Sequence, residues 1–229
     1  MKIIIRVFYF ITIFFLISSC SEDENNEPQT ECNFVNFKYY NNEQDLLGEM
    51  SEKYIVIASD TINNNDLITS LIQSKEYFDQ NYEYQINQQR RYKYKYIALK
   101  LISKKSCIEI TNIISDLEQS NIIDYVHYAM QTDDCTNLIW EVIGEKCINS
   151  YSSVFYVKVF DENDLTDLNN TIQETNTVLD HQNQFMPKWF TLRADKNSNG
   201  DALQMANYFH ETNLFEHSEP NVTKIPVEY

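Results

Sequence analysis

The stretches Ser120-Asn121-Ile122-Ile123-Asp124 and Thr212-Asn213-Leu214-Phe215-Glu216 repeat one pattern 92 residues apart (213 − 121 = 92). Each places a hydroxyl residue, an asparagine, two bulky apolar residues and an acid directly after a helical pattern. Asparagine can end a helix in the left-handed conformation, a role that usually falls to glycine. The chain has only 3 glycines. We therefore predict that Asn121 and Asn213 end equivalent helices in two copies of one unit.

The helices that precede these stretches have start signals and apolar stripes. Ser106 and Glu109 have the spacing of a capping box. In the second copy, Ser198 or Asn199 is expected to cap the helix, with Asp201 near its positive end. The stripes follow the i, i+3, i+4, i+7 spacing of an amphipathic helix. They comprise Ile110, Ile113, Ile114 and Leu117 in the first copy, and Ala202, Met205, Ala206 and Phe209 in the second.

The elements before these helices also occur in the same order in both copies. Strand-like runs are expected at residues 54–58, 82–86 and 92–102 in the first copy, and at 154–159, 177–180 and 188–194 in the second. Further helices are expected to start at Asn65 and near Asn163. The order is strand, helix, strand, strand, helix, strand, which predicts an α+β protein with two ferredoxin-like units and antiparallel sheets.

The domain boundaries follow from this repeat. We expect the first unit at residues 34–134, with an additional N-terminal strand over 34–40, and the second at residues 135–229. Residues 138–142 are expected to add another strand that, like 34–40, borders the first copy.

The composition excludes several classes of function. The chain has 229 residues, 34 acids against 18 Lys and Arg, and a formal net charge of −16. Such acidity argues against nucleic acid as a partner. Gly48, Gly144 and Gly200 lie far apart, so the sequence has no glycine-rich phosphate loop. We therefore expect no cofactor. We also expect no enzyme activity, because no nucleophile elbow is visible.

The N-terminus predicts export. Lys2 and Arg6 precede an apolar run over 7–17, which is too short to span a membrane but suits a signal peptide. Ile17-Ser18-Ser19-Cys20 resembles a bacterial lipobox, which implies a signal peptide over 1–19 and a lipid on Cys20. The alternatives are an ordinary secretory signal or an N-terminal anchor. Residues 20–33 are predicted to form an acidic tether. Its acids resemble the export signal of Bacteroidetes surface lipoproteins, which implies a surface-exposed outer-membrane lipoprotein.

The cysteines after Cys20 are Cys32, Cys107, Cys135 and Cys147. In an exported protein they allow two disulfides in three connectivities, of which Cys135 with Cys147 closes the shortest loop. The alternative for Cys107 is a buried free thiol. The wide spacing argues against a zinc site.

Two further patterns carry weaker functional signals. His210 and His217 lie near several glutamates but match no metal motif, so we interpret them as surface histidines. Residues 88–96 interleave basic and aromatic side chains. Period-two alternation predicts a strand with a solvated face of Arg91, Lys93 and Lys95 and a packed face of Tyr92, Tyr94 and Tyr96. A surface for carbohydrate or an acidic partner is the alternative.

Residues 207–221, Asn-Tyr-Phe-His-Glu-Thr-Asn-Leu-Phe-Glu-His-Ser-Glu-Pro-Asn, resemble the end of the fervidolysin-type N-terminal prodomain of secreted subtilisin-like serine peptidases from Bacteroidetes. His210 and Asn213 depart from that pattern, which usually has Tyr and Gly. The resemblance covers about residues 150–222. The glycine-flanked aspartate, histidine and serine of the catalytic domain do not occur in the 229 residues.

The resemblance implies a module that packs a sheet face on a subtilisin-like peptidase, which it inhibits or helps to fold, and lays its C-terminal tail through the active-site cleft. That tail is Thr223-Lys224-Ile225-Pro226-Val227-Glu228-Tyr229. Tyr229 would enter the primary pocket, and Pro226 or Ile225 a more distant one. The alternatives are a frayed tail, a surface lipoprotein that reuses the fold for glycan or protein adhesion, and a remnant of a truncated protease.

Overall fold

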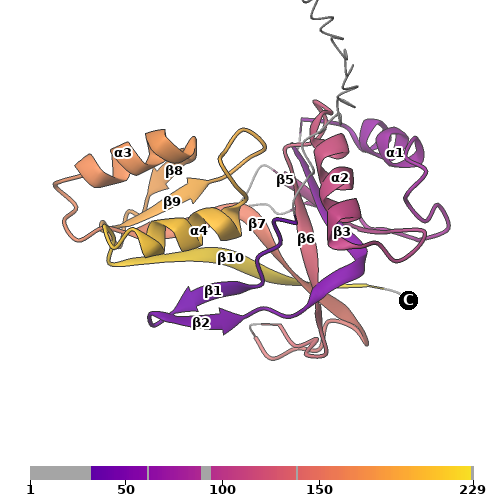
Figure 1. Cartoon of the computed structure of the whole chain (residues 1–229), viewed down its shortest axis with the longest axis horizontal. Helices are drawn as coiled ribbons and strands as arrows, with labels where there is room; N and C mark the ends of the chain where they lie inside the picture. The colour runs from indigo at the N-terminus through magenta and orange to yellow at the C-terminus, as the bar shows by residue number, and fades with distance from the viewer. Residues whose placement is uncertain (1–31, 61, 89–93, 138, 228–229) are drawn as a thin grey trace, which may run out of the picture.

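The computed structural model describes residues 32–60, 62–88, 94–137 and 139–227 (Figure 1). The first half contains β3 (Met50–Asp60), α1 (Asn65–Gln73), β4 (Asn87–Gln88), β5 (Tyr94–Lys100), α2 (Cys107–Glu118) and β6 (Tyr125–Thr132). The second half contains β7 (Cys147–Lys158), α3 (Thr166–Thr175), β8 (Val178–Gln182), β9 (Trp189–Arg193), α4 (Ala202–Glu211) and β10 (His217–Pro226). A hairpin of β1 (Phe37–Tyr40) and β2 (Glu43–Leu46) precedes both.

The two halves have the same strand order. In the first, β5 and β6 flank β3, and β4 pairs with β5. In the second, β9 and β10 flank β7, and β8 pairs with β9. Every ladder is antiparallel, and the described part of the chain contains four helices. The predicted mixed α+β class with antiparallel strands is confirmed.

One eight-stranded sheet joins the halves, because the end of β6 pairs with the beginning of β7 over Met130–Thr132 and Cys147–Asn149. Strand β10 pairs along the other edge of β7, from Lys158 back to Cys147. In Figure 1, β10 therefore runs from the half that carries α3 and α4 toward the half that carries α1 and α2.

Each half buries one sheet face beneath its own helices. In the first, Ile55 and Ile57 of β3 pack in one cluster with Ile110 and Leu117 of α2. In the second, Phe155 of β7 meets Phe209 of α4 with ring centroids 5.3 Å apart. Both predicted helix stripes face these cores, although Ile114 is only partly buried.

One helix start is confirmed and the other prediction is wrong. Ser106 and Glu109 form the predicted capping box at α2. At α4 the cap is Asp201, which makes a capping box with Gln204. Ser198 and Asn199 do not cap α4, because their side chains donate to the carbonyls of Asn176 and Glu174 at the end of α3.

Of the two predicted left-handed helix ends, one is confirmed and the other is wrong. Asn213 adopts the left-handed conformation, with φ of 57°. Asn121 does not, because α2 ends in a right-handed turn at Gln119. Asn176, which the repeat did not single out, ends α3 with φ of 53°.

The additional strands differ from prediction. Strand β1 pairs with β2 and lies against the second half, where the Asn207 side chain donates to the Phe37 carbonyl at 2.9 Å. It therefore does not border the first copy. Residues 139–142 form no strand, and only an isolated bridge joins Thr136 to Val142. Residues 82–86 do not form the predicted strand. Pairing with β5 begins after them, at Asn87 of β4.

The predictions for the signal peptide at 1–19, for Cys20 and for the tether up to residue 31 lie outside the described residues. Among the residues that the structure describes, no helix is long and apolar enough to cross a membrane.

Candidate protein-binding face

The sheet of the second half has one face that α3 and α4 do not cover. Phe155, Val157 and Phe190 point to the helices, so their strand neighbours point to the opposite face. The ladder places two rows there, Glu219-Tyr156-Thr191-His181 and His217-Lys158-Trp189. Most of these side chains are half-exposed, while Thr191 is buried and His181 is exposed. The face therefore presents aromatic, imidazole and charged groups together.

Contacts between these side chains fix their positions. The rings of Trp189 and His217 meet edge to face at 5.5 Å, and the Lys158 ammonium lies 6.0 Å from the indole centroid. His217 Nε2 lies 3.4 Å from Glu219. Lys158 also donates to Glu216, and this hydrogen bond lowers the pKa of the Glu216 carboxyl. Trp189 is therefore held in a network of charged and aromatic neighbours.

Exposed apolar side chains extend this face at one end. The turn between β8 and β9 presents Phe185, which is 92% exposed, and Met186, and Phe160 follows the end of β7. The Asn183 side chain accepts hydrogen bonds from the N–H groups of Phe185 and Met186. The turn thus holds Phe185 outward at the end of the sheet where Trp189 begins β9. We call the surface formed by Tyr156, Lys158, Trp189, His181, His217, Phe185 and Met186 the open face.

The histidines predicted to lie on the surface belong to different environments. His210 stacks on Tyr39 at 4.0 Å, and burial lowers its pKa. His217 belongs to the open face. Within the described residues no group of three or more His, Cys, Asp or Glu side chains could hold a metal ion.

The alternating basic and aromatic run is only partly described, because residues 89–93 lie outside the described ranges. Lys95 is buried, and its ammonium donates to the Asn63 carbonyl. The prediction of a solvated lysine face is therefore wrong at Lys95. Tyr94 and Tyr96 pack as expected, in a cluster with Tyr125.

The C-terminal tail is part of the sheet. Ile225 pairs with Ile148 and Pro226 with Cys147, and the N–H of Val227 donates to the Lys146 carbonyl at 3.0 Å. Val227 is buried against the first half, beside a cavity of about 760 Å³. Tyr229 lies outside the described residues. Entry of the tail into a peptidase cleft stays a prediction, and it would require these residues to leave β7.

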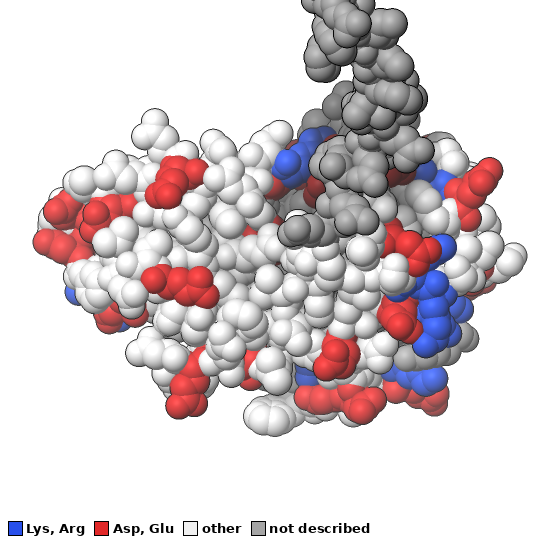
Figure 2. All heavy atoms as spheres, in the orientation of Figure 1, with Lys and Arg blue, Asp and Glu red and all other residues white. Residues whose placement is uncertain are grey.

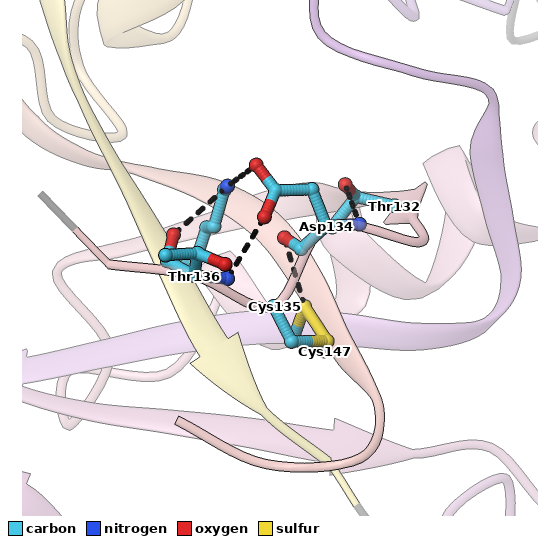
Figure 3. The surroundings of a disulfide bond; sticks show 6 residues. Thr132, Asp134, Cys135, Thr136 and Cys147 are labelled. Atoms are coloured by element: carbon cyan, nitrogen blue, oxygen red, sulfur yellow. Dashed lines mark hydrogen bonds and ion pairs between the residues drawn. A yellow bond between two sulfur atoms is a disulfide. The ribbon is translucent and has the colours of Figure 1, made fainter. Parts of the chain in front are cut away.

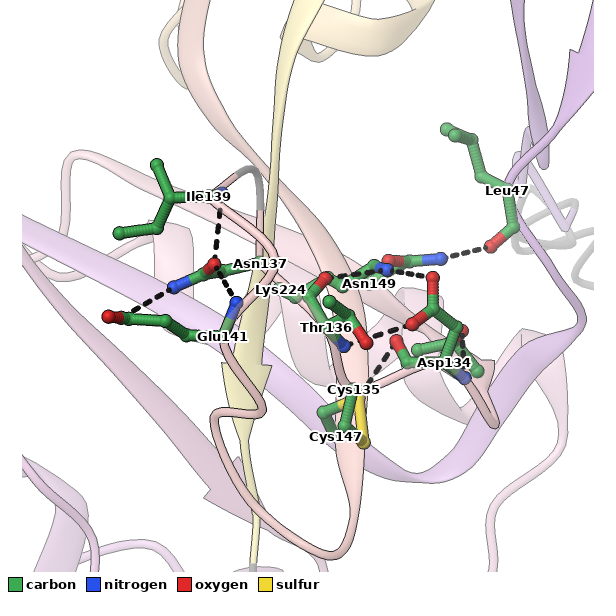
Figure 4. A network of polar contacts seen from close by, with 11 residues as sticks. Leu47, Asp134, Cys135, Thr136, Asn137, Ile139, Glu141, Cys147, Asn149 and Lys224 are labelled. Carbon is green, nitrogen blue, oxygen red and sulfur yellow. Dashed lines mark hydrogen bonds and ion pairs between the residues drawn. A yellow bond between two sulfur atoms is a disulfide. The ribbon is translucent and has the colours of Figure 1, made fainter.

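The four cysteines form two disulfides, Cys32 with Cys107 and Cys135 with Cys147. This settles which of the three connectivities the fold adopts, and Cys107 is not a free thiol. The second disulfide (Figure 3) closes a loop whose base is tied by Lys224, which donates to Asp134 at 2.6 Å and to the Thr136 carbonyl (Figure 4).

The tip of this loop presents a tryptophan that the sequence analysis did not single out. Asn137 Oδ1 accepts from the N–H groups of Ile139 and Glu141 (Figure 4). Between them Trp140 adopts φ of 66° and is 89% exposed. A bulky residue is strained in that conformation, so the loop holds Trp140 outward at a cost in stability. Exposure and strain leave no periodic signal in a sequence, so only the structure shows them.

Comparisons with known proteins add little. No family model matches the chain, and no curated protein matches it. Among solved structures, the small subunit of acetolactate synthase from Thermotoga maritima is 7% identical, with a TM-score of 0.27, over 77% of this chain and 97% of that chain. A similarity of that size supports no conclusion about function.

Proposed function

We propose that this chain is a non-catalytic, exported and lipid-anchored protein that binds a subtilisin-like serine peptidase and inhibits it or helps it to fold. In this proposal the two halves are ferredoxin-like units, and the lipid on Cys20 holds the protein at the outer membrane, exposed on the cell surface. The partner binds the second half, which carries the resemblance to a subtilase prodomain.

The open face is the observation that carries this proposal. A prodomain of that family packs a sheet face on its enzyme, and the second half leaves such a face without covering helices. Tryptophan, tyrosine and arginine dominate the energetic centres of protein interfaces. Trp189 and Tyr156 lie near the middle of the open face, with Phe185 and Met186 at its end, so a partner could bury a contiguous aromatic and apolar surface there.

The net negative charge of the protein favours a specific partner over nonspecific association. Acidic residues are scattered over the side of the molecule shown in Figure 2, whereas the basic residues gather mainly at the end that carries α1 and α2. Net acidity of this kind limits association with anionic surfaces and other acidic proteins. The open face combines Lys158 and two histidines with Glu219, so its recognition would depend on shape and aromatic contact more than on net charge.

Biolayer interferometry with an immobilised peptidase tests the proposal. The peptidase would be a subtilisin-like enzyme from the same envelope, with its active-site serine blocked so that it cannot digest the protein. Trp189→Ala removes the central anchor, and we expect a loss of about 2 kcal/mol, or roughly 30-fold in Kd. Trp140→Ala is the matched control, because it removes the other tryptophan from a loop outside the open face.

The expected result is that the control binds within about threefold of the unmodified protein. Equal losses in the two variants, or no binding of any such peptidase at micromolar concentration, would reject the open face as a peptidase site. Deletion of residues 223–229 with unchanged inhibition would reject the tail alone and leave the open face standing.

A second candidate function is adhesion through the disulfide-closed loop. Trp140, Ile139 and Val222 border a cavity of about 580 Å³, together with Lys38, Asn149 and Lys224. An exposed indole beside amide and ammonium groups suits a glycan or an extended peptide. Binding on an oligosaccharide array that Trp140→Ala abolishes and Trp189→Ala does not would favour this function over the first.

A further inference from the structure

A cavity of about 760 Å³ lies on the face of the first half that α1 and α2 do not cover. Tyr96 and Ala98 of β5 form its floor. Residues 82–87 form one wall, and the end of β10 over 223–227, with residues 143–146 beside it, forms the other. We call this cavity the β10 groove. None of its lining residues belongs to the open face, so it raises a separate question of function.

The side chains of the wall over residues 82–87 alternate like those of a strand. Tyr84 and Ile86 pack into the core beneath the helices, while Glu83, Gln85 and Asn87 line the groove. Such alternation is typical of an extended segment. Pairing with β5 begins only at Asn87. This wall therefore presents one carboxylate and two amide side chains to the groove.

The opposite wall presents the outer edge of β10. The N–H of Val227 donates to the Lys146 carbonyl, in register with the ladder between β10 and β7. Antiparallel strands bond to a neighbour through alternate residues, so Lys224 and Pro226 turn their backbone polar groups away from β7. No strand in the described part of the chain pairs with that edge. Pro226, which has no N–H to offer, is typical of such an edge.

The charges around the groove favour a basic ligand. Glu83 and Glu145 are exposed, line the groove from different walls and form no ion pair within the described ranges. The basic residues of the lining are Lys146 and Lys224, and the Lys224 ammonium already donates to Asp134 at 2.6 Å. The chain as a whole carries a formal charge of −16. Long-range attraction therefore brings cationic ligands to the protein.

We propose that the β10 groove binds an extended basic peptide of about five residues, which adds as a strand to the outer edge of β10. The N–H and C=O of Lys224 and the C=O of Pro226 recur at the two-residue spacing of a strand, about 7 Å, and a peptide backbone matches that spacing. Apolar side chains of the peptide lie on Tyr96 and Ala98, and the alternate basic ones reach the carboxylates of the walls. Five residues span about 17 Å, the length of β10 over 223–227.

Isothermal titration calorimetry on the purified protein tests this proposal with the peptide acetyl-Lys-Val-Lys-Val-Lys-amide. The control peptide has glutamate in place of each lysine, so it keeps the strand propensity of the valines and reverses the charge. We expect the lysine peptide to bind and the glutamate peptide to show no binding at the same concentration.

Two methylated forms of the lysine peptide test the strand pairing itself. Methyl groups on the backbone nitrogens of the two valines block one edge of the peptide, and methyl groups on those of the third and fifth residues block the other. We expect one form to bind about tenfold more weakly or less, because two hydrogen bonds are lost, and the other to stay within about threefold. Equal effects of the two forms would overturn strand addition.

Lys224→Pro removes the outward N–H of β10, and Lys224→Ala is the matched control, because it removes the same ammonium but keeps the N–H. The proline variant should bind the lysine peptide about fivefold more weakly than the alanine variant. Trp189→Ala should bind it as the unmodified protein does, and a loss there would place the peptide on the open face instead. Equal affinities of the two Lys224 variants, equal binding of the lysine and glutamate peptides, or no binding at millimolar concentration would also overturn the proposal. If Lys224→Pro does not fold, the methylated peptides decide alone.

Discussion

The titration of His127 is the property of this fold that a simple experiment tests most directly. The side chain lies on β6 in the middle of the helix-free face of the first sheet, opposite Val56 of β3 and beneath Tyr151 of β7. Burial lowers its pKa from 6.5 to about 3. Folding therefore requires a neutral imidazole, whereas the unfolded chain takes up a proton once the pH falls below 6.5.

The sign and size of the effect follow from proton linkage. A group with a lowered folded pKa contributes stability that is present above the unfolded pKa and is lost as the pH falls toward the folded pKa. One pKa unit corresponds to about 1.4 kcal/mol. Between pH 6.5 and pH 4.5, His127 should therefore remove about 2 kcal/mol from the free energy of unfolding, and about 4 kcal/mol by pH 3; counted from pH 7.5, the loss at pH 4.5 is about 3 kcal/mol.

Two carboxyl groups act in the opposite direction. Burial raises the pKa of Glu118 to about 7 and that of Asp124 to about 6. Their contribution is fully present below the unfolded carboxyl pKa and is lost as the pH rises through the folded values. Between pH 6.5 and 4.5 they offset the loss from His127 in the unmodified protein. The difference between a variant and the unmodified protein is consequently the quantity to measure.

Urea unfolding of the unmodified protein and of His127→Phe at pH 7.5 and pH 4.5 measures that difference. We expect the free energy of unfolding of the variant to rise by about 3 kcal/mol relative to the unmodified protein when the pH falls to 4.5. Phenylalanine changes the packing, but a packing effect is the same at both pH values. His181→Phe, at a position that is exposed in β8, is the control that replaces a histidine outside the buried face. A shift below about 1 kcal/mol for His127→Phe, or equal shifts for both variants, would refute the reasoning.

Two further predictions concern stability. Replacement of Cys32 and Cys107, separated by 75 residues, should lower the free energy of unfolding by about 4 kcal/mol, against about 3 kcal/mol for Cys135 and Cys147, separated by 12. Denaturant unfolding of the two double serine variants checks the order, and a larger loss from the shorter loop would contradict the loop-entropy argument. Asn213→Ala should cost about 1 kcal/mol because alanine is strained at a φ of 57°, while Asn121→Ala should stay within about 0.5 kcal/mol. Thermal melts of both compare them, and equal losses would show that the left-handed helix end contributes nothing.

The sequence predicted the features that local chemistry controls. The spacing of Ser106 and Glu109 found a capping box, and the apolar stripes found the buried faces of α2 and α4. It failed where tertiary contacts compete for the same residue. Ser198 and Asn199 have side chains suited to a cap, but both bond to the end of α3 and leave the capping to Asp201. The alternating pattern predicted that Lys95 is solvated, but its ammonium donates to the Asn63 carbonyl in the loop before α1. Neither outcome could be obtained from periodicity.

The comparison of the two halves explains why the second one is the better candidate for binding a partner. In the first half, the helix-free face carries Tyr54, Val56 and His127, all of which are almost fully buried. They pack near β7 and the end of β10, as the clusters with Ile148 and Val227 and the contact with Tyr151 show. The corresponding face of the second half keeps Tyr156, Trp189 and His217 half-exposed. The two halves therefore share a strand order but differ in exposure. Strand β7 and the end of β10, from the second half, help to cover the helix-free face of the first half. A partner that recognises a sheet face would therefore meet it on the second half, where the aromatic side chains of that face are accessible.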